Sequence, residues 1–203
     1  MPERVFLASR NAKKVAEMQR ILAEHVPGVL VVGLDDVPDY DEPVEDAPDF
    51  AGNALLKARA GWAATGLATV ADDSGLCVDA LNSMPGVLSA RWSGPPKDDD
   101  RNNRLLLDQL VDVPEERRGA HFECAVAFVA GERELVVTGQ MKGRVIRECR
   151  GSGGFGYDVL FVPDDQAGTL TSAEMDSATK DAISHRGRAL RALAPQIAPV
   201  LGA

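Results

Sequence analysis

Two adjacent acids, a serine and a glycine follow a short apolar run in the first half of the chain. Leu67 to Ala71 is typical of a buried strand, and Asp72-Asp73-Ser74-Gly75 comes directly after it. Carboxylates at the end of a buried strand are held on rigid backbone, which suits metal binding or general-base catalysis. The same residue types also dominate ordinary polar turns, so this stretch alone leaves both interpretations open.

A second candidate site lies near the N-terminus, where Arg4 to Ala8 is predicted to form a strand. The run Ser9-Arg10-Asn11-Ala12-Lys13-Lys14 follows, and the next residues predict a helix with one apolar face that contains Val15, Met18, Leu22 and Val26. Free backbone N–H groups at a helix start, with lysines beside them, can hold phosphate. The alternative is an N-capped surface helix with solvated lysines, and this segment alone favours the alternative.

A glycine-rich segment near the C-terminal quarter, Gly151-Ser152-Gly153-Gly154-Phe155-Gly156, matches the G-x-G-x-x-G pattern. Dinucleotide-binding folds require a helix after these glycines, whereas Tyr157 to Pro163 is predicted to be a strand. We therefore reject that fold and expect a loop between two strands, which still lets a ligand approach the backbone closely. Phe155 or Tyr157 could stack on a base there. A flexible hairpin is the alternative.

Two cations occupy the predicted start of the last helix, in Ser184-His185-Arg186-Gly187. Because a helix N-terminus favours anions, they indicate that a ligand or a carboxylate balances their charge, and a solvated helix start is the alternative. Thr171-Ser172-Ala173-Glu174 fits a capping box that would open a short helix towards Lys180.

The elements predicted around these motifs are strands and capped helices. Further strands are expected over residues 29–34, 119–130, 134–141 and 143–150, the last two joined by a tight Lys-Gly connection, and further helices begin after Asp49 and Asp98. From Asp35 to Asp49 the chain has eight acids, no basic residue and three prolines, a composition typical of a solvated loop. One of these carboxylates could still reach a metal site.

Composition limits the function classes. The chain has 203 residues, 45% of them hydrophobic, enough to form a core in one domain or two small lobes. A formal net charge of −9 argues against a nucleic-acid polymer as the main partner, although local lysines and arginines can hold a single nucleotide. No apolar run approaches the ~20 residues that span a membrane. Three scattered cysteines without a Cys-x-x-Cys pair are typical of reduced thiols in a cytoplasmic protein.

Five motifs follow one another along the chain: Ser9-x-Asn11-x-x-Lys14, Asp72-Asp73-Ser74-Gly75, Gly154-Phe155-Gly156-Tyr157-Asp158, Lys180, and Ser184-His185-Arg186-Gly187. No single motif is specific, but the five in this order resemble the inosine triphosphate pyrophosphatase family over nearly the whole chain. The resemblance implies an α/β fold with a long twisted mixed β-sheet flanked by helices. It also implies a single domain over residues 1–203 with two lobes and a central cleft, and a homodimer.

The resemblance further implies magnesium-dependent cleavage of ITP, dITP or XTP into a nucleoside monophosphate and pyrophosphate. Asp73 would ligate Mg²⁺ and act as the base on water, and Glu45 would be the second acidic ligand, with Asp39 and Glu42 as alternatives. The residues that would hold the triphosphate are Ser9, Arg10, Asn11, Ala12, Lys13 and Lys14, and Ser74 would touch the substrate. The residues that would hold the base and sugar are Phe155, Gly156, Tyr157, Asp158, Lys180, His185 and Arg186. Arg10 stands where the family usually has glycine, so its role stays open.

The residue types fit this chemistry independently. Magnesium prefers oxygen ligands and is shared between one or two carboxylates and substrate phosphates. No Cys or Ser nucleophile with an adjacent His is evident, which favours direct attack by water. Two other functions stay open: a Maf-type pyrophosphatase acting on pyrimidine or modified nucleotides, and a nucleotide-sensing module that binds a triphosphate without turnover.

Overall fold

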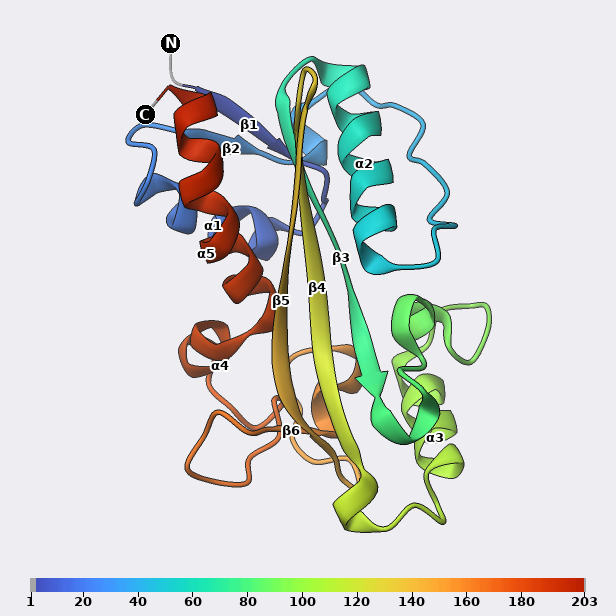
Figure 1. Ribbon diagram of the computed structural model, residues 1–203. Helices are drawn as coiled ribbons and strands as arrows, with labels where there is room; N and C mark the ends of the chain where they lie inside the picture. Colours follow the sequence, from blue (N-terminus) through green and yellow to red (C-terminus); the bar gives the residue numbers. More distant parts are fainter. Residues whose placement is uncertain (1–2, 203) are drawn as a thin grey trace. The chain divides into compact units, whose positions relative to one another are not determined.

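The computed structural model describes residues 3–202, which form an α/β structure built on one mixed sheet (Figure 1). Its strand order is β2-β1-β3-β4-β5-β6. The strands are β1 (Arg4–Leu7), β2 (Leu30–Val32), β3 (Ala68–Val78), β4 (Gly119–Ala130), β5 (Arg133–Val145) and β6 (Phe161–Pro163). β1 pairs in parallel with β2 and with β3, whereas β5 and β6 are antiparallel. The predicted α/β class with a mixed sheet and flanking helices is confirmed.

Local capping signals explain where most helices begin. The helices are α1 (Ala12–Ala23), α2 (Phe50–Thr65), α3 (Asp99–Gln109), α4 (Ser177–Ile183) and α5 (His185–Ile197). The predicted caps are confirmed: Asn11, Asp49 and Asp98 each accept a hydrogen bond from a backbone N–H in the first turn of α1, α2 and α3. None of the helices described is long and apolar enough to cross a membrane.

The chain divides into two compact units. The first consists of the residues up to Asp73, Cys124–Gly139 and the residues from Arg186 onward. The second consists of Ser74–Glu123 and Gln140–His185. The chain therefore changes unit inside the predicted metal motif, between Asp73 and Ser74. The central cleft stays a prediction.

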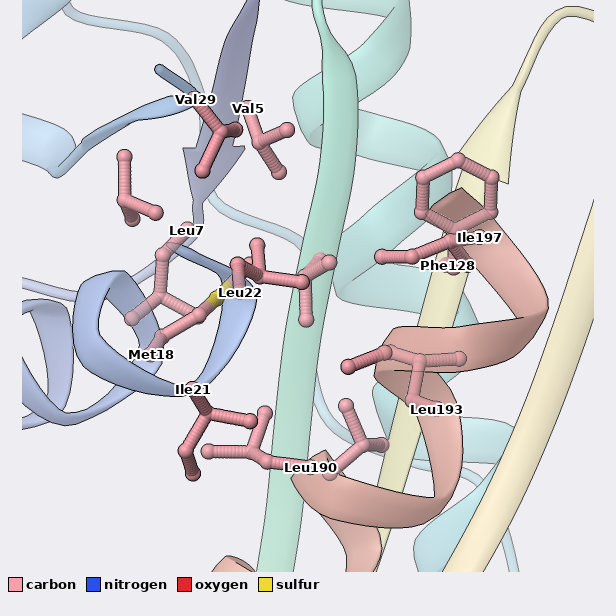
Figure 2. Close-up of a cluster of buried hydrophobic side chains, with 14 of the residues drawn as sticks. Val5, Leu7, Met18, Ile21, Leu22, Val29, Phe128, Leu190, Leu193 and Ile197 are labelled. Atoms are coloured by element: carbon pink, nitrogen blue, oxygen red, sulfur yellow. The ribbon is translucent and has the colours of Figure 1, made fainter. Parts of the chain in front are cut away.

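The core of the first unit lies where two helices pack on its strands (Figure 2). Met18, Ile21 and Leu22 of α1 and Leu190, Leu193 and Ile197 of α5 form one buried cluster with Val5, Leu7, Val70, Val126 and Phe128 of the sheet. Burying apolar surface is favourable by about 25 cal/mol per Å². This cluster therefore holds α1 against the first half of β3, and these two elements carry part of the N-terminal motif and the paired acids.

The second unit has its own core. Leu106 of α3 and Leu110, the residue that caps the end of this helix, are buried with residues of β3, β4, β5 and β6 and with Tyr157 of the short 3₁₀ turn η5 (Gly156–Val159). The rings of Phe122 and Phe161 meet edge to face, with centroids 4.8 Å apart. The glycine-rich segment thus continues into a turn that is anchored in a core.

The predicted end of a strand at Ala71 is wrong. β3 continues to Val78 through the two acids, Ser74 and Gly75. A Cβ atom at Gly75 would lie 2.4 Å from both the Gly86 carbonyl oxygen and Ser89 Oγ. The glycine therefore serves a close approach of the segment 86–91 to the strand and not a turn.

Three other local predictions need correction. Residues 134–141 and 143–150 are not two strands, because β5 is continuous and Gly143 lies inside it, paired with Pro163 of β6. Residues 157–163 divide into η5 and the shorter β6. Thr171–Glu174 forms a turn in which Glu174 accepts a hydrogen bond from Thr171 N, and α4 begins later, after its cap Asp176.

Candidate functional site

Asp73 lies in a polar cluster of the first unit, and two residues one turn apart on α2 contact it. Asn53 Nδ2 donates a hydrogen bond to Asp73 Oδ2 at 3.0 Å. Lys57 Nζ lies 3.7 Å from Asp73 Oδ1 and donates to the carbonyl oxygen of Asp72 at 2.7 Å. Residues spaced by four share one face of a helix. The side of α2 that faces β3 therefore holds both the carboxylate and the strand backbone.

Glu45 joins this cluster through the same lysine. Lys57 Nζ lies 2.8 Å from Glu45 Oε1, so Glu45 and Asp73 are both within 4 Å of one ammonium nitrogen. Glu42, an alternative ligand, is instead ion-paired with Arg10. Asp39 adds to the negative charge around Arg10, and Glu42 foremost raises the pKa of that guanidinium. Among the three acids considered, Glu45 is thus the one placed beside Asp73.

The carboxylates of Asp73 and Glu45 suit a divalent cation. They converge on one cationic nitrogen, so their position favours positive charge. Within residues 3–202 no three His, Cys, Asp or Glu side chains are grouped as a metal site. Magnesium typically takes one or two carboxylates and completes its shell with waters and substrate phosphates. The pair therefore fits an ion that the substrate helps to bind.

Asp72 makes a buried ion pair with Lys14 of α1. The two side chains are 2.6 Å apart, and that of Asp72 is only 5% exposed. Burial raises the pKa of Asp72, but Lys14, Arg186 and Lys57 lower it more, so it lies below the ordinary value of 3.8. Asp72 is therefore ionised at neutral pH and holds the Lys14 ammonium in place.

Sequence reasoning assigned no role to Lys57 or Asn53 in this cluster, and it considered Asp72 only as one of two adjacent acids suited to metal binding or general-base catalysis. One signal for Asp72 exists in the sequence. If a strand continues through two adjacent acids, alternation sends one of them to the buried face, and a buried carboxylate requires a cation.

The segment from Ser9 to Lys14 is an N-capped helix start. Ser9 Oγ accepts a hydrogen bond from Asn11 N at 3.2 Å, and Asn11 Oδ1 accepts one from Lys13 N at 3.0 Å. Ala12 and Lys13 are exposed, and the first turn of α1 carries no acid. The positive end of the helix dipole is thus left without a carboxylate in its own first turn, which favours an anionic ligand.

The two basic residues at the start of α5 have different surroundings. Arg186 Nε donates to Glu17 Oε2 of α1 at 2.8 Å, so a carboxylate balances the charge of Arg186. The sequence indicated either a ligand or a carboxylate as this partner. His185 belongs to the second unit, where its ring stacks on Phe122 with centroids 5.1 Å apart.

An exposed aromatic ring lies in the glycine-rich segment of the second unit. Phe155 is 68% exposed. Its N–H donates to Asp158 Oδ2 at 2.9 Å, and Lys180 Nζ lies 2.5 Å from the same oxygen and 5.6 Å from the centre of the Phe155 ring. The structure thus brings together three of the residues predicted to hold the base and sugar. An exposed ring on a fixed loop is suited to stacking on a base.

Tyr157, the other aromatic considered for stacking, is buried. Its hydroxyl donates to the Ser89 carbonyl at 2.9 Å, and burial raises its pKa well above the ordinary value of 10. The loop before it is also fixed, because Gly153 N donates to the Ala173 carbonyl at 3.0 Å. Phe155 is therefore the aromatic residue of this motif that a ligand can reach.

Ser74, which was predicted to touch the substrate, is exposed on β3.

The fold and these clusters together define an α/β protein with paired strand acids, flanking lysines and an exposed aromatic ring. Residues 5–196 match the model of the Ham1 family, and the chain belongs to this family. The resemblance predicted from the five motifs is confirmed.

Relatives are similar over nearly their whole length. A Nocardia farcinica protein named dITP/XTP pyrophosphatase is 62% identical over 197 residues, which are 96% of this chain and 95% of that protein. A protein of the same name from Mycolicibacterium paratuberculosis is 58% identical, with 95% of each chain covered.

Solved structures have the same fold. The crystal structure of a nucleoside-triphosphatase / dITP/XTP pyrophosphatase from Mycobacterium abscessus has a TM-score of 0.79 at 56% identity and covers 95% of this chain and 99% of that one. The Staphylococcus aureus Ham1 protein has a TM-score of 0.87 at 32% identity and covers 98% of this chain and 100% of that one.

Proposed function

We propose that this protein hydrolyses deaminated purine nucleoside triphosphates (ITP, dITP and XTP) to a nucleoside monophosphate and pyrophosphate, and so cleanses the nucleotide pool. The observation that carries the proposal is the Asp73 carboxylate held by Asn53 and Lys57, with Glu45 at the same ammonium group. The names of the relatives support the same reaction. A module that only binds nucleotide has no need of this arrangement.

The proposed chemistry is direct attack by water. Asp73 orients the water and accepts its proton while the water oxygen bonds to the α-phosphorus. The bond from that phosphorus to the α,β-bridging oxygen breaks, and pyrophosphate leaves with this oxygen. Lys14, held by Asp72 at 2.6 Å, would bind the triphosphate together with the start of α1. Phosphoryl transfer of this kind depends mainly on positioning and charge neutralisation.

We propose Mg²⁺ as the cofactor, held by Asp73 and Glu45. Both are oxygen ligands, which magnesium prefers. When bound, the ion supplies neutralisation of the phosphate charge. Phe155, Asp158, Lys180, His185 and Arg186 would hold the base and sugar. A homodimer and a cytoplasmic location belong to the same proposal, and light scattering at twice the 21.6 kDa chain mass would support the dimer.

The test is pyrophosphate release from ITP by the purified protein with Mg²⁺, in parallel with a pyrimidine triphosphate and with excess EDTA. We expect release from ITP that EDTA abolishes and added Mg²⁺ restores. Preference for the pyrimidine triphosphate would favour a Maf-type enzyme instead. Binding of ITP without any release would favour the nucleotide-sensing module.

A further inference from the structure

Helix α3 holds the backbone of Gly156, in the glycine-rich loop, through both its N–H and its carbonyl group. Gly156 N–H donates to Asp99 Oδ2 at 2.8 Å, and the Gly156 carbonyl accepts from Asn103 Nδ2 at 3.0 Å. Asp99 and Asn103 are four residues apart, so they lie on one face of α3. Asn103 is 4% exposed. Sequence reasoning gave neither residue a function.

The conformation of Gly156 makes this contact consequential. Gly156 has φ +60°, and Phe155 before it is extended, with φ −161° and ψ 169°. Glycine populates positive and negative φ about equally, so the residue type alone does not fix the loop. Two hydrogen bonds to the same residue select one state. That state sets the direction in which Phe155 projects.

The backbone groups of Phe155 are also hydrogen-bonded within the loop. Phe155 N–H donates to the Asp158 carboxylate at 2.9 Å, and the Phe155 carbonyl accepts from Asp158 N at 3.3 Å. Because the Gly156 N–H and carbonyl are hydrogen-bonded to side chains of α3, the backbone N–H and carbonyl groups of both Phe155 and Gly156 have partners. Phe155 and Gly156 therefore offer a ligand the Phe155 ring, while both of their backbone N–H groups already donate within the protein.

We propose that Asp99 and Asn103 are positioning residues that hold Phe155 as a rigid stacking surface, which adds affinity for any purine ring without discriminating between purines. This inference rests on the proposed function. A ring held in its binding direction does not have to be ordered when the ligand arrives, which improves affinity. Stacking tolerates any base, because every base has a π-face.

The test compares Asp99→Ala with two matched variants. Asp99→Asn keeps an oxygen that can accept from Gly156 N–H and is the rescue variant. Asp100→Ala removes the exposed neighbouring acid from the same first turn of α3 and is the control. Asn103→Ala tests the second hydrogen bond. Because Asn103 is buried, the thermal unfolding of the Asn103→Ala variant is measured first. If that variant is unstable, Asp99→Ala alone is used for the test.

Two readouts are expected to move together. Amide hydrogen exchange of residues 150–158 should speed up in Asp99→Ala and stay near wild type in Asp99→Asn and Asp100→Ala. KM for ITP should rise roughly 3- to 10-fold in Asp99→Ala with kcat nearly unchanged, as expected for the loss of one pre-ordered contact. KM for ATP should rise by the same factor, so the ratio of the two kcat/KM values stays constant.

The outcomes separate this inference from the proposed function. Unchanged hydrogen exchange in Asp99→Ala and Asn103→Ala overturns the positioning role, whatever the substrate is. Faster exchange with unchanged KM overturns its link to binding, and a changed ITP/ATP ratio overturns the claim of non-discrimination. If the wild-type protein releases no pyrophosphate from any triphosphate, the proposed function fails. Calorimetric affinity for inosine 5′-monophosphate then replaces KM as the measure of stacking on the loop.

Discussion

At the scale of residues, the two adjacent acids divide their tasks because they stand on a strand. Successive side chains of a strand point to opposite faces. Asp72 is buried against Lys14, whereas Asp73 is partly exposed between Asn53 and Lys57. One acid therefore holds a cation in place while its neighbour stays available for chemistry. The two residues could exchange these tasks only if the strand were turned so that Asp73 faced the core and Asp72 faced α2.

The buried pair predicts a pH-dependent stability. Because the pKa of Asp72 is lower in the folded protein than its ordinary 3.8, its ionisation stabilises the fold above pH 3.8. This contribution is lost as pH falls through the folded pKa. Asp72→Asn should lower the free energy of unfolding by about 1.5–3 kcal/mol at pH 7, the range for hydrogen bonds to charged groups. The difference should shrink below pH 3.8.

Urea unfolding of wild type and Asp72→Asn at pH 7, 5 and 3 measures this difference. Asp46→Asn, which changes an exposed acid of the loop between Asp35 and Asp49, is the control and should track the wild type. An Asp72→Asn difference that stays the same at pH 3 and pH 7 would show that ionisation of Asp72 does not stabilise the fold.

The other acid predicts a loss of turnover. Asp73→Asn keeps the shape and an acceptor for Asn53 Nδ2 but removes the proton-accepting group. Loss of a positioned general base costs roughly 10²–10⁴ in rate. We expect kcat for ITP to fall by a factor of roughly 10²–10⁴ or more. Calorimetry in the presence of Mg²⁺ should still detect ITP binding. Near-normal turnover by the purified variant would remove Asp73 from the catalytic role, and Asp46→Asn again serves as the control.

At the scale of elements, β3 contains Gly75 at a point where the segment 86–91 approaches the strand closely. A Cβ at this position would meet the Gly86 carbonyl and Ser89 Oγ at 2.4 Å. Gly75→Ala should therefore lower the free energy of unfolding by about 1–3 kcal/mol through overpacking. Gly168→Ala is the matched control, because its Cβ would meet nothing closer than 3.6 Å. Equal stability of the two variants in urea unfolding would contradict the close approach.

The elements also show what could be predicted from sequence. Helices with local caps, such as those after Asn11, Asp49 and Asp98, were predicted correctly because side chain and backbone interact within a few residues. The continuity of β3 and β5 was missed because each strand contains a glycine, at Gly75 and Gly143, which by local sequence alone indicates a turn. Pairing and close approach to distant segments decide those positions.

In the candidate site, too, local features could be predicted from the sequence and long-range contacts could not. Asp73 and Glu45 were proposed because carboxylates have recognisable chemistry and the motifs resemble a family. The contacts and roles of Lys57, Asp99 and Asn103 were missed because these contacts join residues that are far apart in the sequence. Spacing along a helix is visible in a sequence, but the element that the helix faces is not.

At the scale of the whole molecule, an anionic protein has to bind an anionic substrate. The formal net charge is −9, and several of the cations assigned to substrate already contact carboxylates. Lys14 contacts Asp72, Lys180 contacts Asp158 and Arg186 contacts Glu17. A triphosphate must therefore compete with these carboxylates for its cations. This balance is the reason why charge neutralisation by a divalent ion is part of the proposed function.

Selection among purines depends on the hydrogen-bonding edge of the base. Hypoxanthine and xanthine carry an acceptor oxygen at C6 and a protonated N1, whereas adenine has an amino donor and a bare acceptor there. Donors aimed at position 6 would each be left unsatisfied by adenine at a cost of about 1–3 kcal/mol. Two such mismatches correspond to roughly two to four decades in affinity. Guanine keeps the 6-oxygen, so its rejection requires a steric or desolvation penalty at the 2-amino group.

We therefore expect kcat/KM for ITP and XTP to exceed that for ATP by at least ~100-fold. His185 and Arg186 are the donors we assign to this selection, so the gap should shrink when Arg186 is replaced. Arg186→Ala alone would leave the buried Glu17 carboxylate unpaired, so the informative variant combines Arg186→Ala with Glu17→Gln. Glu17→Gln alone is its control and should keep the wild-type gap. Comparable hydrolysis of ATP and ITP by the wild-type protein would contradict this selectivity, because a pocket that accepts adenine cannot be directing two donors at position 6.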